Sequence, residues 1–385
     1  MLRIPKPAHV RRFFATKLWP PLATFAAEEL QAVLAHYDLG HWHATETLGG
    51  GDSENIVLRT GQGKKVLKRH SWPWPHPLIE HSLFRYLAGI GFPVPHLVLN
   101  AAGRTYTEVG NKCYALLDFV EGYCADNYFL LPETRRRWTA QAAEVLARFH
   151  QAMAGFVPEG EGAKFDGFMP DDQRLFRDVA WHLAVLDRWA ESVARKGSPD
   201  GLGPFLSSIM DQLRQDLVEA GRHYEQPDSQ LPRLTIHADY KPENVLFNRD
   251  GVAAVLDFGA ACVNLRALDV ARGLTSFSRA GKYGVDEHLA VIFLQAYLCR
   301  QPLSDREVSA IPDLIRWRHL RNIVWKIDYL EAHPPSQARD THLAFMRSKW
   351  QENLWMKAHG ERLQVCLLKG LDAQITRSKL FCGNR

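Results

Sequence analysis

The sequence predicts an α+β fold in two lobes, a small antiparallel β-sheet with one key helix and a larger, mostly helical lobe. Three observations predict it. Short apolar runs separated by turn residues lie between residues 41 and 120, and apolar residues recur at helical spacing through much of residues 121–385. A chain of 385 residues also has room for two lobes and an N-terminal extension with a helix, residues 1–40.

The N-terminal 30 residues mix basic and apolar side chains, as an export or transit signal does. Their apolar run is broken by Lys17, Pro20 and Pro21, and the segment continues into an acidic stretch around Glu28 and Glu29. We therefore expect an arm leading to a helix over residues 24–37 rather than a cleaved signal. No segment is long enough to span a bilayer.

A cluster of glycines precedes the first predicted strand, Ile56–Arg59, in the string LGGGDSEN. Glycines let backbone N–H groups approach phosphate oxygens, although a hairpin turn without a ligand explains the same cluster. The candidate residues are Gly49, Gly50, Gly51, Ser53 and Asn55.

The next predicted elements are a strand that ends in Lys68 and a helix with apolar residues at helical spacing from Ile79 to Ile90. Glu80 lies at the edge of that apolar face, where it either pairs with the lysine or serves the helix dipole. GFPVP then ends the helix, and apolar runs at His96–Leu99 and Tyr114–Val120 complete the small sheet.

The larger lobe is predicted from three apolar stripes with helical spacing. Ala142, Val145, Leu146, Phe149 and Met153 form the first, and residues 176–193 and 205–217 form the others. Residues 196–204, rich in Gly, Ser and Pro, are expected to be a surface connection. These helices are expected to frame a pocket.

A polar string, LTIHADYKPENVLFNRDGVAAVLDFG at residues 234–259, lies among predicted strands at 233–236, 245–247 and 253–256 and a turn at 248–251. Its acids and amide have the spacing of phosphoryl-transfer sites. Such a site needs a carboxylate beside the acceptor hydroxyl, here Asp239. It also needs oxygen ligands for the Mg²⁺ ions that bridge the nucleotide phosphates, here Asn244 and Asp257. Scattered surface acids are the alternative.

The motif H-x-D-x-x-x-x-N followed by D-F-G resembles the aminoglycoside phosphotransferase family, which includes choline kinase-like and homoserine kinase-like enzymes and shares the protein-kinase fold. The resemblance implies ATP and Mg²⁺ as cofactors and γ-phosphoryl transfer to a small amino alcohol, amino acid or aminoglycoside-like acceptor. It implies that Asp239 accepts the proton and that His237 braces the loop. It also implies a phosphate-binding Lys68 paired with Glu80, and a hinge at Asp118 and Val120 whose backbone recognises adenine.

Two alternatives belong to other classes. A protein kinase is suggested by the D-x-K-P-E-N string at residues 239–244, but Ala238 replaces the usual Arg and no long activation segment or A-P-E string follows Asp257. The second alternative, a catalytically silent binding module, is disfavoured because the polar site residues are present. The roles of Lys241 and of Asp269 stay open, since a helix cap also explains Asp269.

The acceptor is not fixed by any local motif. A late helical segment interleaves cations with aromatic residues, in a layout that resembles homoserine kinase-like members and favours an anionic or zwitterionic acceptor, although basic helix faces are usually solvated. The residues concerned are Arg316, Trp317, Arg318, His319, Arg321, Trp325, Lys326 and Tyr329.

Composition excludes several partner classes. The formal net charge of +4 is mild, and its cations are interspersed with acids, which argues against nucleic acid or a membrane as a partner. The six cysteines have neither metal-site nor disulfide-framework spacing, which indicates reduced thiols and a cytoplasmic protein. The remaining histidines lack an obvious ligand set for a metal.

Overall fold

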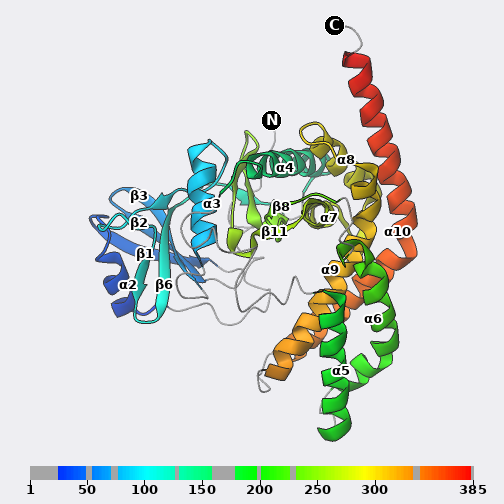
Figure 1. The fold of residues 1–385 in the computed structure, drawn as a ribbon. Coiled ribbons are helices and arrows are strands. Elements are labelled where there is room, and N and C mark those ends of the chain that lie inside the picture. Colours follow the sequence, from blue (N-terminus) through cyan, green and yellow to red (C-terminus); the bar gives the residue numbers. More distant parts are fainter. Residues whose placement is uncertain are drawn as a thin grey trace. The chain divides into compact units, whose positions relative to one another are not determined.

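The computed structural model describes residues 25–48, 54–70, 77–125, 130–157, 178–196, 201–225, 231–332 and 339–382. These residues form two compact units. The first takes in the described chain up to Glu121 and the short segment Ala254–Gly259, and the second takes in the remainder. Each unit is described by itself below (Figure 1).

The first unit is an antiparallel sheet with two helices. Its strand order is β1-β2-β3-β6-β4, and β5 pairs with β6. The elements are α2 (Ala27–Leu34), β1 (Trp42–Leu48), β2 (Glu54–Thr60), β3 (Gly63–Arg69), α3 (Leu78–Gly89), β4 (Leu97–Val98), β5 (Thr107–Val109) and β6 (Lys112–Asp118).

The two faces of this sheet carry different chemistry because successive strand residues point to opposite sides. Leu67 of β3 belongs to a buried hydrophobic cluster with Leu30, Val33 and Leu34 of α2. The next residue, Lys68, pairs with Glu80 of α3 on the opposite face. One strand therefore contributes both to the core and to a polar cluster.

Sequence periodicity missed strand β1 and overestimated the first helix. β1 reads WHATETL and pairs only with β2, at the edge of the sheet, so it lacks the apolar run that marks a buried strand. Helix α2 covers eight residues, Ala27–Leu34, rather than the 14 expected over residues 24–37. The expected N-terminal arm lies outside the described residues.

The second unit is mostly helical. Its helices are α4 (Pro132–Met153), α5 (Val179–Lys196), α6 (Leu202–Glu225), α7 (Arg266–Phe277), α8 (Glu287–Leu298), α9 (Asp305–Ala332) and α10 (Arg339–Cys382). The short elements are β7 (Tyr123–Cys124), β8 (Arg233–Ile236), the 3₁₀ turn η3 (Pro242–Asn244), β9 (Val245–Phe247), β11 (Cys262–Leu265), β12 (Arg279–Ala280) and β13 (Gly284–Val285). Strand β10 (Val252–Val255) and the 3₁₀ turn η4 (Phe258–Ala260) cross between the units.

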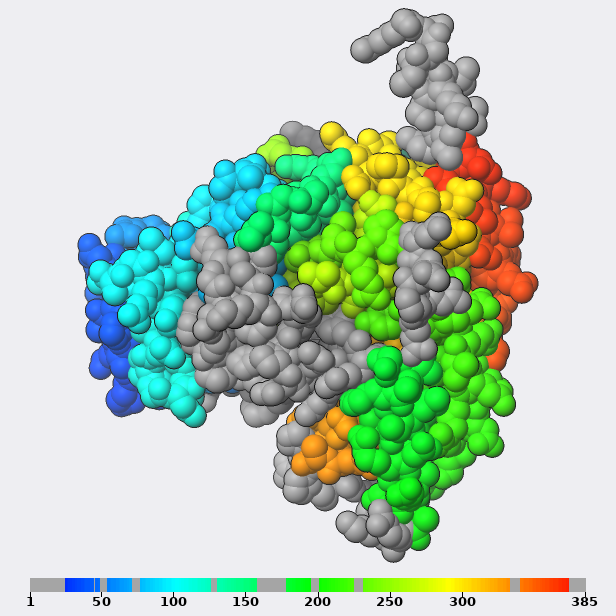
Figure 2. All heavy atoms as spheres, viewed as in Figure 1, coloured from blue at the N-terminus to red at the C-terminus, as the bar shows by residue number. Residues whose placement is uncertain are grey.

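Helix α9 is the centre of the second unit, because α5, α6, α7 and α10 all pack against it. Helices α5 and α6 lie side by side, and their surfaces adjoin in Figure 2. Trp317 of α9 is fully buried and packs on Tyr224 of α6 with ring centroids 5.3 Å apart. Gly221 of α6 permits this contact, because a Cβ there would lie 2.2 Å from Val179 and 3.2 Å from Trp317.

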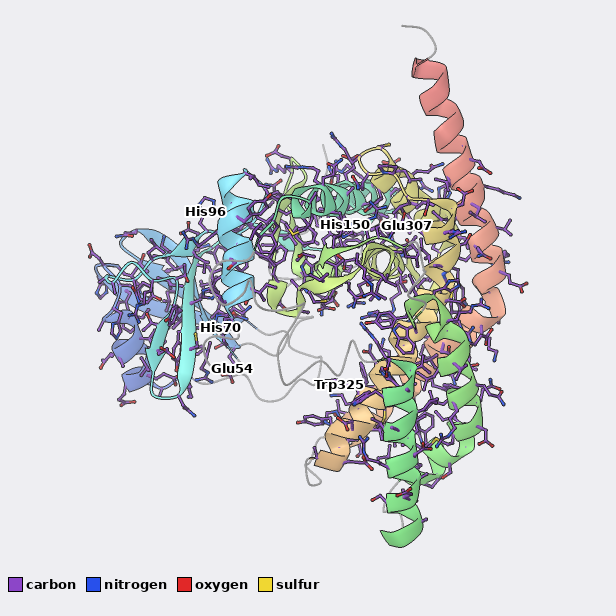
Figure 3. The ribbon with its side chains drawn as sticks, in the orientation of Figure 1. Glu54, His70, His96, His150, Glu307 and Trp325 are labelled. Atoms are coloured by element: carbon purple, nitrogen blue, oxygen red, sulfur yellow. The ribbon has the colours of Figure 1, made fainter. Side chains whose placement is uncertain are left out.

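Buried ion pairs fix the register of the helices around α9. Arg266 at the start of α7 donates Nε and Nη2 to the carboxylate of Glu307 (Figure 3) at 2.9 and 2.8 Å. Arg316 Nη2 of α9 lies 3.2 Å from Asp216 Oδ1 of α6. The other oxygen of the same carboxylate, Oδ2, accepts a hydrogen bond from Asn353 Nδ2 of α10 at 2.7 Å. Arg316 was expected in the acceptor pocket, but it belongs to this structural network.

No helix among the described residues is long and apolar enough to cross a membrane.

The Glu307 carboxylate is expected to be essential for stability. Replacing it with alanine leaves the buried Arg266 cation without its partner, which costs about 3–5 kcal/mol. Chemical denaturation of Glu307→Ala should show a loss of that size in the free energy of unfolding. The matched control is Glu361→Ala, which removes an exposed carboxylate from α10 and should change stability by less than about 0.5 kcal/mol. Equal stability of the two variants would contradict the prediction.

Candidate active site

The polar cluster of the first unit is centred on Lys68. Its Nζ donates to Glu80 Oε1 at 2.6 Å and to Asp257 Oδ1 at 3.4 Å. Lys68 and Glu80 are both buried, whereas the Asp257 side chain is 38% exposed. Burial lowers the pKa of Lys68, but the two carboxylates outweigh that effect and raise its pKa to about 12. Lys68 therefore stays charged at neutral pH.

Two histidines lie next to this cluster, His81, which is buried, and His70, whose side chain is 6% exposed. His81 Nε2 lies 3.2 Å from His70 Nε2, and His81 Nδ1 lies 2.9 Å from Thr105 Oγ1. His70 (Figure 3) places Nδ1 3.6 Å from Glu80 Oε2. Burial and the nearby Lys68 lower the pKa of His81 to about 3 and the pKa of His70 well below its ordinary value, so both rings are neutral at pH 7.

The backbone at Asp257 adopts an unusual conformation. Its φ of 60° lies in the left-handed region, which costs a non-glycine residue about 1–2 kcal/mol. On one side, Phe258 is fully buried and packs edge-on against Phe84 of α3, with ring centroids 5.4 Å apart. On the other side, the backbone N–H of Val255 donates to the carbonyl of Pro93 at 2.8 Å. These contacts on both sides of Asp257 hold the strained residue in place.

The polar loop of the second unit, residues 237–244, is held by Asp269, which is fully buried on α7. Its two carboxylate oxygens accept the backbone N–H groups of His237 and Ala238 at 2.8 and 2.9 Å. His150 of α4 (Figure 3) contacts the same carboxylate through Nε2 at 3.1 Å. Asp269 therefore stabilises the left-handed conformation of Ala238, whose φ is 63°. It does not cap its own helix, whose N-cap residue is Leu265.

This anchored loop presents the carboxylate of Asp239 between two cations. Arg272 Nη2 donates to Oδ1 at 2.7 Å, and Lys241 Nζ lies 2.6 Å from Oδ2. His237 accepts the Asp239 backbone N–H at its Nδ1, at 3.3 Å. Burial raises the pKa of Asp239, but the charges of Arg272 and Lys241 outweigh it and hold the pKa far below its ordinary range.

Asn244 lies in the same loop and is oriented by Asp239. Its Nδ2 donates to the Asp239 carbonyl at 3.0 Å and to the Asp239 carboxylate at 3.3 Å. Its Oδ1 makes no hydrogen bond to any other described residue. A hard cation such as Mg²⁺ prefers oxygen ligands of this kind, and the Asp257 carboxylate offers another in the first unit. Each oxygen is of the kind that the predicted metal prefers, and the metal site itself stays a prediction.

A pocket in the second unit lies next to this loop, because Arg272 of α7 lines the pocket and binds Asp239 of the loop. The residues that line it come from α7, β12–β13, α9 and α10. They are Arg272, Thr275, Ser276, Arg279, Tyr283, Gly284, Val285, Arg318, His319, Lys349, Glu352 and Met356.

The sequence-predicted residues therefore fall into separate groups. Lys68, Glu80 and Asp257 meet in the first unit, and His237, Asp239 and Asn244 meet in the second. Asn55 lies opposite Lys68 in the β2–β3 pairing. Gly49, Gly50, Gly51 and Ser53 lie outside the described residues.

The predicted hinge positions differ in their backbone bonding. Asp118 donates its backbone N–H to His96 O at 2.9 Å and binds Lys65 at 2.6 Å through its side chain. Val120 follows β6, and its backbone groups make no hydrogen bond to another described residue. Of the two, Val120 has both its N–H and its carbonyl free for a ligand.

Sequence reasoning missed the other charged residues of the pocket, Arg272, Arg279, Lys349 and Glu352. The sequence carried one signal for Arg272, because it lies three positions after Asp269 and so about one helical turn further along the same face. The other three belong to segments that show no motif. Of the basic residues expected from α9, Arg318 and His319 line the pocket. Lys326 instead places its Nζ over the ring of Trp325, 4.2 Å from the ring centroid.

The chain is similar in sequence to a known family and to known enzymes. The profile of a family described as the phosphotransferase enzyme family matches residues 43–308. A homoserine kinase of Gluconobacter oxydans (strain 621H) is 28% identical over 333 residues, which cover 84% of this chain and 94% of that protein. A homoserine kinase of Caulobacter sp. (strain K31) is 30% identical over 305 residues, 76% of this chain and 83% of that protein.

Solved structures show the same fold. Spectinomycin phosphotransferase APH(9)-Ia, in complex with ADP and spectinomycin, matches with a TM-score of 0.61 at 14% identity, over 84% of this chain and 94% of that one. The prediction of an α+β, protein-kinase-like fold is thereby confirmed.

Asp269 is expected to hold the polar loop rather than only to stabilise α7. In Asp269→Asn one oxygen becomes an NH₂ group that cannot accept from the backbone. Losing a hydrogen bond to a charged group costs about 1.5–3 kcal/mol, so local opening at Ala238 should become about 10- to 100-fold more frequent. Hydrogen exchange of the His237 and Ala238 amides measures this change. The matched control, Asp250→Asn in the β9–β10 turn, should leave both amides as in the wild type. Unchanged exchange in Asp269→Asn would refute the anchor.

Proposed function

Because the chain belongs to the phosphotransferase enzyme family, we propose that it transfers the γ-phosphoryl group of ATP to the hydroxyl of a small amino acid or amino alcohol, with L-homoserine as the first candidate. The observation that carries the proposal is the Asp239 carboxylate, held by an anchored loop beside Asn244, Lys241 and Arg272. The homoserine kinase relatives favour an amino acid acceptor.

In this proposal Asp239 binds and orients the acceptor hydroxyl. Its depressed pKa makes it a weak base, since an efficient general base has a pKa near the working pH. A loose phosphoryl-transfer transition state needs little deprotonation before the new O–P bond forms. The carboxylate then takes the proton late, as the hydroxyl oxygen becomes acidic. Orientation therefore contributes more than basicity.

In this proposal several of the sequence-predicted residues bind the nucleotide. Lys68 is a permanent cation, oriented by Glu80, and suits phosphate oxygens. Asn244 and Asp257 would hold Mg²⁺, which neutralises charge on the nucleotide phosphates when it is bound. The backbone of Val120 suits the adenine edge, and the glycines at 49–51 remain candidates for covering the phosphates.

A protein substrate is less well supported. In protein kinases a long segment after the D-F-G string binds the peptide. Here β11 begins at Cys262, five residues after Asp257, pairs with β8 and leads directly into α7 at Arg266. The chain has no room for a long peptide-binding segment at this point. A silent binding module would need none of the ordered charges around Asp239, so their geometry favours catalysis.

The direct test is ADP release from Mg²⁺-ATP by the purified protein, with product identification by mass spectrometry. L-Homoserine, choline, ethanolamine, an aminoglycoside and a generic protein substrate are compared. The proposal expects acceptor-dependent ADP release with L-homoserine and a product 80 Da heavier than the acceptor. Phosphorylation of the protein substrate alone, or of no acceptor at all, would contradict it.

Asp239→Asn should lower kcat by at least about 10²- to 10⁴-fold, because the amide can neither take the proton nor hold the hydroxyl in the same way. Affinity for a non-hydrolysable ATP analogue should change little. Steady-state kinetics and calorimetry measure the two quantities, with Asp250→Asn as the matched control. Turnover near the wild-type level in Asp239→Asn would reject this assignment.

Asp257→Asn should weaken the use of Mg²⁺, because a neutral amide is a poorer ligand for a hard cation than a carboxylate. The Mg²⁺ concentration needed for half-maximal turnover should rise, and saturating Mg²⁺ should restore part of the activity. A Mg²⁺ titration measures this shift. The control Glu108→Gln removes an exposed acid from β5 of the same unit and should leave the titration unchanged. A wild-type titration curve for Asp257→Asn would argue against the metal role.

A further inference from the structure

The pocket beside the polar loop has an excess of positive charge. Four of its lining residues are Arg or Lys, namely Arg272, Arg279, Arg318 and Lys349, whereas Glu352 is the one carboxylate among the described residues that line it. Burial lowers the pKa of His319 to about 4, so its ring is neutral at pH 7. The side chains alone therefore leave this pocket with uncompensated cations.

Both oxygens of the Glu352 carboxylate already contact other side chains. Glu352 Oε2 lies 2.7 Å from Lys349 Nζ and 2.9 Å from His319 Nδ1, and its Oε1 accepts from Arg279 Nη2 at 3.1 Å. These three contacts involve both oxygens of the buried carboxylate. Glu352 thus explains the position of Lys349 and Arg279 but not that of Arg318.

Arg272 is also committed to other groups. Its Nη2 donates to Asp239, and its Nη1 donates to Ser276 Oγ at 2.9 Å. Arg318, by contrast, makes no hydrogen bond or ion pair with another described residue. Burial and the nearby Arg272 lower the pKa of Arg318 well below its ordinary value, and the charges of Asp239 and Glu352 offset this effect only in part. A guanidinium in this position is suited to bind a carboxylate with two parallel hydrogen bonds.

We propose that the pocket is the subsite for the carboxylate of the acceptor, with Arg318 as its direct ligand and Lys349 as a second cation beside it. This inference rests on the proposed function and extends it, because it identifies what selects one acceptor class from another. The link to the reacting centre is Arg272, which lines the pocket and binds Asp239.

The subsite predicts a definite order of acceptors. An α-amino acid that carries a side-chain hydroxyl satisfies both Arg318 and Asp239. An amino alcohol without a carboxylate leaves Arg318 unpaired, and a polycationic aminoglycoside is repelled by the four cations. The protein should therefore select its acceptors by the presence of a carboxylate group rather than by the presence of an amine.

The test compares L-homoserine with 3-amino-1-propanol, which is the same molecule without the carboxylate. Turnover with ATP and calorimetric binding in the presence of a non-hydrolysable ATP analogue are measured for the wild type and for Arg318→Gln. We expect the wild type to prefer L-homoserine by about 10- to 100-fold in both measurements, the size of a lost charged hydrogen bond. Arg318→Gln should lose this preference because its homoserine affinity falls, while its affinity for 3-amino-1-propanol stays unchanged.

Two further variants separate a binding role from a structural one. Arg318→Lys keeps the charge without the guanidinium fork and should restore part of the preference, which a general folding defect would not allow. Arg137→Gln, an exposed cation of α4, is the matched control and should keep the full preference.

The outcomes also separate this inference from the proposed function. If the wild type phosphorylates L-homoserine and Arg318→Gln retains the full preference, the subsite is wrong and the function stands. If no acceptor is phosphorylated but homoserine binding still depends on Arg318, the function is wrong and the subsite stands. Equal binding of the two probes by the wild type would overturn the subsite directly.

Discussion

The buried carboxylate of Asp269 is the interaction on which the candidate site depends. It accepts the backbone N–H groups of His237 and Ala238, and so fixes the loop that carries Asp239. The same helix, α7, supplies Arg272 one turn later, and Arg272 binds Asp239 directly. Loop and cation are therefore positioned by one rigid element. The start of α7 is in turn joined to α9 by the buried Arg266–Glu307 pair, and α9 carries Arg318.

This arrangement has a chemical consequence. A carboxylate that lies between Arg272 and Lys241 stays ionised at neutral and mildly acidic pH, but it is a poor base and a poor nucleophile. Such a group is well suited to hold a hydroxyl in line with a phosphoryl group and to take a proton late in the reaction. Lys68 provides the corresponding permanent charge in the first unit, where Glu80 and Asp257 keep it protonated.

Short-range patterns predicted much of this structure, and long-range contacts account for the rest. The strands at 233–236 and 245–247 were predicted with correct bounds because apolar runs and turn residues are local signals. The polar string likewise predicted Asp239, Asn244 and Asp257 as site residues, and their roles stay predictions. The pocket was not predictable as a whole, because α7, α9 and α10 bring together residues up to 84 positions apart in sequence, from Arg272 to Met356. Helical rotation also decides that Arg318 lines the pocket while Arg316, two residues earlier, belongs to a buried network with Asp216.

The central claim is that a hydroxyl held by Asp239 attacks ATP directly. The stereochemistry at phosphorus tests it most directly, using ATP made chiral at the γ-phosphorus with oxygen isotopes and analysis of the phosphorylated acceptor. A single in-line transfer inverts the configuration, and this account predicts inversion. Retention would mean two successive transfers through a phosphorylated enzyme group. That result would contradict the assignment of Asp239 as the residue that orients the acceptor.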